Sequence, residues 1–190
     1  MSSGSKLRIL GIDPGLNITG YAVIETAARG PVVCEAGVIR GRDRDSLTSR
    51  LDEIHRGLTE VIAQWQPAVM SLEELYSHYQ RPRTAILMGH ARGVICLAAA
   101  QANIAVHHYS ATNVKKTITG NGRATKRQIQ LAVTRELTLA APPEPPDVAD
   151  ALAIALVHFY ADKRKRTAPS PKLHRVAKQP SPTESEVSEP

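Results

Sequence analysis

The chain has 190 residues, of which 42% are hydrophobic and 22% are charged, and its formal net charge is +6. This length suits one domain with a sizeable core, and the composition excludes a chain without stable structure. The positive charge is compatible with a nucleic-acid partner but does not identify one. Because we find neither a membrane span nor a secretory signal, and the two cysteines lack zinc-site spacing, we expect a cytoplasmic protein with reduced thiols.

The first half of the chain is predicted to begin with strands and to continue with alternating helices and strands. Segments rich in β-branched residues, with Gly or Pro near their ends, predict hairpin-connected strands at residues 8–15, 19–28 and 32–41. Apolar residues then recur every three or four positions over residues 47–66, which predicts an amphipathic helix that ends before Pro67. Residues 68–75 read as a buried strand, and the alanine-rich residues 83–103 read as a second helix.

The second half is predicted to contain one more strand and two helices. Residues 105–110 are predicted to form another short strand, and residues 112–123 form a polar segment interrupted by glycines. Helices follow near residues 125–139 and at residues 147–163, with a proline-rich break at residues 141–146 between them. Three antiparallel strands followed by a βαβ unit predict an α/β fold with a mixed five-stranded sheet flanked by helices.

Two regions are expected along the chain. Residues 1–163 contain all the predicted strands and helices, so we expect one folded domain there. Residues 164–190 carry basic residues, scattered Pro and Ser, and few apolar side chains. Such a segment buries too little apolar surface to offset the entropy of ordering, so we expect a disordered tail.

Acidic residues lie at the ends of two predicted strands. Asp13 ends the first strand, where a carboxylate needs a partner, although Asp-Pro-Gly is also an ordinary turn sequence. Glu73 and Glu74 end the fourth strand, and neighbouring side chains of a strand point to opposite faces. Only one of the two glutamates can therefore share a face with Asp13; a pair of solvated acids is the alternative interpretation.

Two further acids lie at the start of the last predicted helix. Asp147 and Asp150 are three positions apart, which places them on one helix face. Helix capping is the alternative, with Asp147 as the N-cap and both acids near the positive end of the helix dipole. That alternative explains Asp150 less well, because the apolar run ALAIAL follows it and indicates a side chain that faces the protein.

The predicted topology brings these acids together. The first and fourth strands become neighbours when a right-handed βαβ unit follows three antiparallel strands, and a last helix across that sheet end adds its aspartates. Clustered carboxylates repel one another unless a cation is present, and oxygen ligands without a His or Cys cluster indicate Mg²⁺ or Mn²⁺. Two such ions can activate a water and stabilise the leaving oxygen of a phosphodiester. The pattern indicates metal-dependent phosphoryl transfer without naming the substrate.

Four segments in order resemble the RuvC-type Holliday-junction resolvases. They are GIDPGLNITGYAVI, SLEELY followed by GHARGV, VKKTITGNGRATKRQIQ, and PPDVADALAIALVHF. Together they span residues 9–159, and only the stretch between Tyr76 and Gly89 matches loosely. Each segment alone is a weak signal, but the ordered set is specific. The resemblance implies an RNase H-like fold and paired, metal-dependent cleavage of Holliday junctions in recombination and DNA repair.

The resemblance also implies roles for individual residues. The positions that match the family's catalytic, metal-binding acids are Asp13, Glu73, Asp147 and Asp150, with two Mg²⁺ (or Mn²⁺) ions per active site. Glu73 takes this role, and Glu74 does not, because Glu73 lies two places after Ser71 in SLEELY, as the family's glutamate does.

Three further positions match residues that contact DNA in the family. Lys115 and Lys126 match basic positions near the scissile phosphate, and Tyr76 matches an aromatic residue that can stack on an unpaired junction base. The alternatives are solvated lysines and a tyrosine that only packs.

The resemblance implies a homodimer, because two equivalent cuts in a nearly two-fold symmetric four-way junction require two equivalent sites. It also implies the branch-migration proteins RuvA and RuvB as partners.

One rival interpretation is an actin-like ATPase or sugar kinase, whose first strand also ends in an acid, but 190 residues leave no room for its second lobe. Another rival is a related RNase H-like nuclease that acts on RNA or on non-junction DNA. A third, a member that binds junctions without cutting them, conflicts with the intact acidic set.

Overall fold

The computed structural model describes residues 7–41, 46–75 and 82–167. Tyr76 and residues 168–190 of the expected tail lie outside these ranges. Within them, no helix combines the length and the apolar character needed to cross a membrane.

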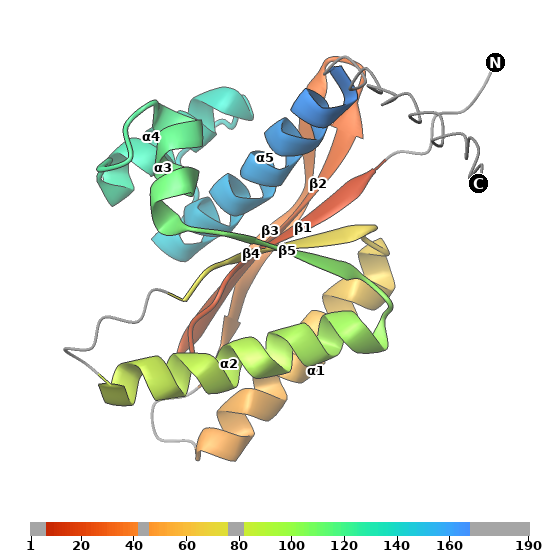
Figure 1. Cartoon of the computed structure of the whole chain (residues 1–190), viewed down its shortest axis with the longest axis vertical. Helices are drawn as coiled ribbons and strands as arrows, with labels where there is room; N and C mark the ends of the chain where they lie inside the picture. The colour runs from red at the N-terminus through yellow and green to blue at the C-terminus, as the bar shows by residue number, and fades with distance from the viewer. Residues whose placement is uncertain (1–6, 42–45, 76–81, 168–190) are drawn as a thin grey trace, which may run out of the picture.

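The described residues form a single mixed sheet with helices on both faces (Figure 1). The elements in chain order are β1 (Arg8–Asp13), β2 (Ile18–Ala27), β3 (Gly30–Arg40), α1 (Leu47–Trp65), β4 (Val69–Glu73), α2 (Pro82–Gln101), β5 (Ala105–Tyr109), α3 (Ala111–Thr119), α4 (Lys126–Glu136) and α5 (Pro146–Thr167). The strand order is β3-β2-β1-β4-β5. β1 pairs antiparallel with β2 and parallel with β4, and β4 pairs parallel with β5. The predicted α/β fold with a mixed five-stranded sheet is confirmed.

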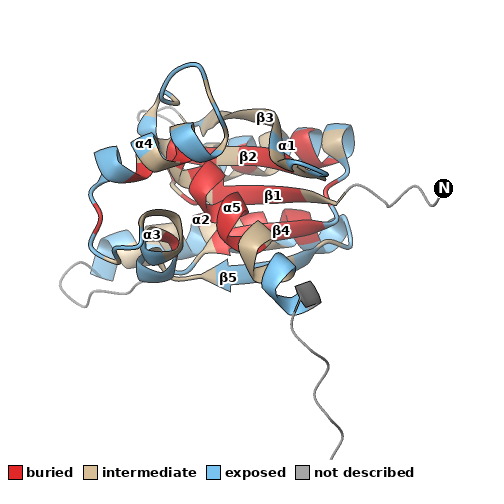
Figure 2. Ribbon diagram, turned by 90° about the horizontal axis from the view of Figure 1, so that it is seen from above, coloured by how far each residue is buried: buried red, intermediate tan, exposed pale blue. Residues whose placement is uncertain are grey.

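The sheet separates two apolar cores. On one face, α1 and α2 cover side chains such as Leu10, Ile12 and Leu72, which are fully buried. On the other face lies α5, which packs on β1 and β2 and is itself covered by α3 and α4 (Figure 2). Residues 151–157 of α5 are at most 1% exposed, so this helix is buried on nearly all sides.

The termini of α1 follow directly from its sequence. Ser46 is the N-cap, with a side chain that accepts a hydrogen bond from the Ser49 N–H, and Gln66 closes the helix in the left-handed region at φ 46°. Ile54 and Leu58 lie one turn apart and are fully buried against the sheet.

The sequence interpretation was wrong about α3. Residues 112–123 were read as a polar segment, but Ala111–Thr119 is a helix. Ser110 caps it by accepting a hydrogen bond from the Asn113 N–H, and among its side chains only Val114 is buried. Its apolar residues Ala111, Val114 and Ile118 do lie three and four positions apart, but nine residues give only a short pattern of this kind. The helix is stabilised by its cap and by packing on α5.

The last helix also differs from its predicted ends. It begins at Pro146, a residue suited to the first helical turn, and it continues to Thr167, past the predicted end at Lys163. Because the helix begins before Asp147, this residue lies in the first turn and is not the N-cap.

Small residues allow α5 to lie directly on the sheet. A Cβ on Gly11 would lie 2.3 Å from the Ala151 carbonyl oxygen, and one on Gly20 would lie 2.2 Å from the Asp147 carbonyl oxygen. The buried Ser71 hydroxyl on β4 donates a hydrogen bond to the Ile154 carbonyl at 2.8 Å. These contacts fix the height and position of α5 over β1, β2 and β4.

We predict that Gly11→Ala lowers the free energy of unfolding by about 3 kcal/mol, because the added methyl group must push α5 off the sheet. In a chain of this size the melting temperature should fall by roughly 6–12 °C, as measured by calorimetry. Gly120→Asn is the control, since its Cβ would meet nothing within 4 Å and asparagine accepts the left-handed C-cap conformation at φ 77°. Equal melting temperatures for Gly11→Ala and wild type would refute the close contact between β1 and α5.

Candidate active site

A pocket of about 190 Å³ opens where β1 and β4 end. Its polar lining consists of the carboxylates of Asp13, Glu73 and Asp150 and the ammonium groups of Lys115 and Lys126. The remaining wall is formed by Ala111, Val114, Ile129 and Ile154. Five charged groups from β1, β4, α3, α4 and α5 therefore share one small space.

The sheet register places Asp13 beside Glu73. Ile12 and Leu72 are partners in the parallel β1–β4 pair, so the next residue on each strand is an acid at the same edge. The two carboxyl groups lie close enough that the charge of Glu73 raises the pKa of Asp13. Glu74 is exposed and is absent from the pocket lining, and its backbone N–H donates to the Tyr109 carbonyl at 2.8 Å. Of the two glutamates, the structure brings Glu73 to Asp13.

Helix α5 supplies the other two acids. Asp150 lines the pocket, with a side chain that is 24% exposed. Asp147, one turn earlier, does not line the pocket, but its charge still raises the pKa of Asp13. The contact between the Asp147 backbone and Gly20 keeps this end of α5 near Asp13, because Gly20 is the partner of Asp13 across the β1–β2 pair.

Lys126 is held at the pocket by the start of α4. Thr125 and Gln128 form a capping box, which fixes the first turn in which Lys126 lies. A cation there is disfavoured by the helix dipole, but Lys126 Nζ lies 3.3 Å from Asp150 Oδ2. This ion pair provides the reason for a lysine at that position. Lys115 enters the pocket from α3.

The negative charges of the carboxylates repel one another, and this repulsion raises their pKa values. Burial, followed by the charges of Glu73, Asp150 and Asp147, raises the pKa of Asp13 to about 8. Burial also raises the pKa of Glu73 and of Asp150, although the nearby lysines work against this rise. Burial disfavours the Lys126 ammonium, but the charges of Asp150, Asp13 and Asp147 outweigh it and raise its pKa. The site retains protons unless more positive charge is supplied.

The donor set fits a hard divalent cation. Within the described ranges, no three His, Cys, Asp or Glu side chains already form a group that could hold a metal ion. Lys126 forms an ion pair with Asp150 instead. A cation could replace this contact, because it would offset the repulsion that raises the pKa values of the acids and would bind their carboxylate oxygens. The residues present therefore suit Mg²⁺ or Mn²⁺.

Sequence reasoning missed the residues that position α5. Gly11, Gly20 and Ser71 carry no chemistry of their own, yet they set where Asp147 and Asp150 lie. A signal was available, because glycine inside a strand often marks a close backbone approach. It could not identify the approaching segment, which is more than one hundred residues away in the sequence.

The sequence matches known proteins over most of its length. The profile of the family described as "Crossover junction endodeoxyribonuclease RuvC" matches residues 9–158. The chain is 63% identical over 159 residues to the crossover junction endodeoxyribonuclease RuvC of Rhodopirellula baltica, covering 83% of this chain and 88% of that protein. It is 43% identical over 150 residues to the enzyme of the same name from Desulforamulus reducens, covering 79% and 91%.

Solved structures agree with these sequence matches. The structure resembles Thermus thermophilus RuvC in complex with a Holliday junction substrate, with a TM-score of 0.78 and 29% identity over 84% of this chain and 96% of that one. It also shares its fold with the yeast mitochondrial Holliday junction resolvase Ydc2, at a TM-score of 0.56 and 14% identity over 84% of each chain. The chain thus belongs to the RuvC family of crossover junction endodeoxyribonucleases, RNase H-like nucleases of recombination and repair.

Proposed function

We propose that this nuclease resolves Holliday junctions by metal-dependent hydrolysis, with Asp13, Glu73, Asp147 and Asp150 as the catalytic acids that hold two Mg²⁺ (or Mn²⁺) ions. The observation that carries the proposal is the convergence of three of these acids with Lys115 and Lys126 in one pocket. The fourth acid, Asp147, acts on Asp13 through its charge and lies one turn from Asp150. The junction-bound T. thermophilus relative supports the choice of substrate.

The bound ions would supply Lewis acidity, to activate the attacking water and to stabilise the leaving oxygen. The protein's own residues do the rest. The carboxylates of Asp13 and Glu73 are held at adjacent strand ends, so little ordering is needed to place them. Lys115 and Lys126 supply N–H donors to oxygens of the phosphate. Val114, Ile129 and Ile154 form the apolar part of the pocket wall.

We propose a homodimer that is formed through α2. Its exposed face carries Ile86, Gly89, Gly93, Leu97 and Ala100 at helical spacing, with Ile86 62% exposed and Leu97 50% exposed. A Cβ on either glycine would meet nothing within 4 Å, so a second helix can approach this face closely. A two-fold axis here would give two equivalent sites for two cuts.

Family membership also supports RuvA and RuvB as partners and the cytoplasm as the place of action. It supports Tyr76 as the residue that stacks on a junction base, a role that stays a prediction because Tyr76 lies outside the described residues.

Cleavage of a synthetic four-way junction tests the proposed function directly. In Mg²⁺ buffer the chain should cut the junction symmetrically and leave a linear duplex of the same sequence and an RNA–DNA hybrid uncut. EDTA should abolish cleavage, and added Mg²⁺ should restore it. Equal cutting of junction and linear duplex would refute the selectivity, and cutting in EDTA would refute the metal requirement.

Asp13→Asn, Glu73→Gln and Asp150→Asn should each lower the cleavage rate by at least about 10²-fold while junction binding remains, because each change removes a metal ligand and no phosphate contact. Single-turnover cleavage and anisotropy binding measure the two effects separately. Glu74→Gln is the matched control. Its cleavage rate and junction binding should stay close to those of wild type, because Glu74 lies outside the pocket lining. An inactive Glu74→Gln with an active Glu73→Gln would mean that the strand register is wrong.

Lys115→Ala and Lys126→Ala should weaken junction binding and flatten its salt dependence by about one unit of slope each. Binding is measured in EDTA over a salt series. Arg56→Ala removes the same charge from α1, on the opposite face of the sheet, and should leave the slope unchanged. If neither lysine variant changes the slope, both lysines are solvated residues without a DNA contact.

Leu97→Glu should convert the dimer to a monomer in sedimentation experiments, because it buries an unpaired carboxylate in the proposed interface. Leu131→Glu on α4 is the matched control, since Leu131 is 49% exposed and lies away from α2. The Leu97→Glu monomer should also lose coordination of the two cuts. A dimer that survives Leu97→Glu would place the interface elsewhere.

A further inference from the structure

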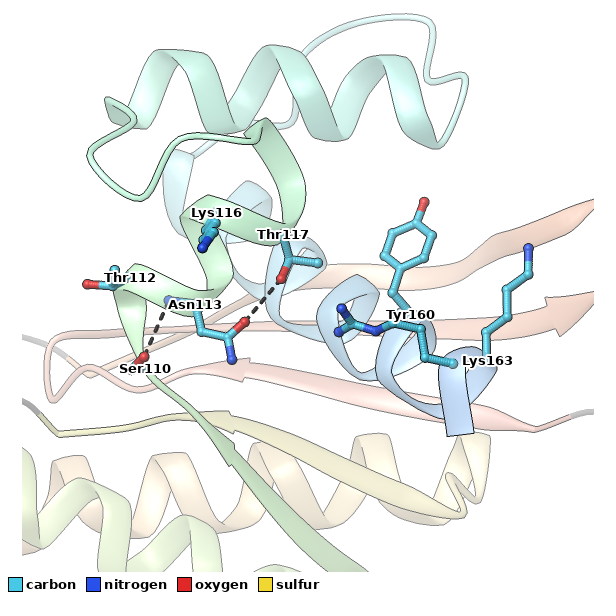
Figure 3. A pocket seen from close by; sticks show the side chains of 8 residues that line it. Ser110, Thr112, Asn113, Lys116, Thr117, Tyr160 and Lys163 are labelled. Atoms are coloured by element: carbon cyan, nitrogen blue, oxygen red, sulfur yellow. Dashed lines mark hydrogen bonds between the residues drawn. The ribbon is translucent and has the colours of Figure 1, made fainter. Parts of the chain in front are cut away.

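We propose that a second pocket, between α3 and the C-terminal half of α5, binds the phosphate backbone of a junction arm and extends the DNA path beyond the catalytic pocket. The hollow measures about 880 Å³ (Figure 3). This inference rests on the proposed function, because it requires that the substrate is DNA.

The chemistry of the lining favours a polyanion. Lys116 on α3 and Lys163 and Arg164 on α5 line the pocket, and none of its described lining residues is a carboxylate. Lys163 and Arg164 are exposed at the surface. Cations from two separate helices that face one hollow create a positive potential that a single solvated lysine does not.

Neutral donors complete the lining. The Thr117 hydroxyl donates to Asn113 Oδ1 at 3.0 Å, which orients the amide and leaves its Nδ2–H donors for a ligand (Figure 3). Ser110 and Thr112 add further hydroxyls to the lining. Tyr160 also lines the pocket, but its hydroxyl donates to Glu136, so it contributes a ring wall and no donor. Hydroxyl and amide donors of this kind commonly contact DNA phosphates.

The position of the pocket fits a strand that passes through the catalytic site. Both pockets have walls from the same two helices, α3 and α5. Lys115 lines the catalytic pocket and its neighbour Lys116 lines the second one, so α3 separates the two. Along α5, Tyr160 follows Asp150 by ten residues, or about 15 Å of helix. That distance corresponds to roughly four base-pair steps along a duplex.

The test combines a protein variant with modified DNA. In Lys116→Ala/Lys163→Ala, Arg164 is retained because its charge also acts on Tyr109. Junction binding is measured in EDTA over a salt series, with Arg56→Ala as the control for loss of charge on the opposite face. We expect the slope of log affinity against log salt to fall by about two units in the double variant and to stay unchanged in the control.

Uncharged methylphosphonate linkages then locate the contact. Placed one at a time along the strand that is cut, they should weaken wild-type binding at linkages about three to five steps from the cut phosphate. The double variant should be insensitive at those linkages and normally sensitive elsewhere. A general loss of charge would change the response at every linkage equally. It could not remove the response at only those linkages.

Two results would overturn the inference. A double variant with the wild-type slope, or without coupling at any linkage, would show that the pocket does not hold the backbone. Loss of poly-glutamate binding with an unchanged junction slope would assign the pocket to an acidic polypeptide instead. Failure of the proposed function is distinct, because the wild-type chain itself would then leave the junction uncut.

Discussion

The direct contact between α5 and the sheet is the constraint on which the active site depends. Gly11 and Gly20 allow the helix backbone to approach β1 and β2 so closely that even a methyl group on either strand would clash with a carbonyl oxygen of α5. The hydrogen bond from Ser71 fixes the same helix to β4. Since Asp147 and Asp150 begin this helix, its height above the sheet decides how far they lie from Asp13 and Glu73. A carboxylate cluster needs such a rigid support, because repulsion favours its dispersal.

The cluster shows how the protein tolerates several half-buried acids close together. Burial and the neighbouring charges raise the Asp13 pKa to about 8, and Lys126 pairs with Asp150 at 3.3 Å. The carboxylate oxygens of these acids also suit a hard cation. The same electrostatic cost that raises these pKa values therefore favours divalent ions, so the arrangement of the acids and the proposed metal requirement have one physical origin.

Helices α3 and α4 connect this centre to the surface. Each contributes a lysine to the catalytic pocket, and both pack on α5, so the same helix supports the basic residues and two of the acids. On the opposite side of the sheet, α2 leaves an apolar stripe exposed. The fold thus separates the face that carries charge and chemistry from the face that we propose for self-association. This separation lets two subunits associate without covering either active site.

Periodicity and composition determined most of the secondary structure. β-branched segments and the spacing of Ile54 and Leu58 predicted the strands and α1, and the strand order followed from the rule for right-handed crossovers. The ordered motifs predicted the family, which is confirmed, and they selected Glu73 over Glu74. The β4 register is in agreement with that selection, since it places Glu73 beside Asp13.

Other features were decided only by the tertiary structure. Helix α3 has only nine residues, so its apolar positions give a short pattern, and it is stabilised by its Ser110 cap and by packing on α5. The ion pair of Lys126 with Asp150 and the shared walls of the two pockets join residues that are distant in sequence. Local patterns report which backbone conformation a segment prefers, whereas distances between segments depend on packing, here on glycines that show no preference for any partner. The sequence alone therefore determined most of the elements and the family and pointed to the candidate acids, and the packing of α5 decided where those acids meet.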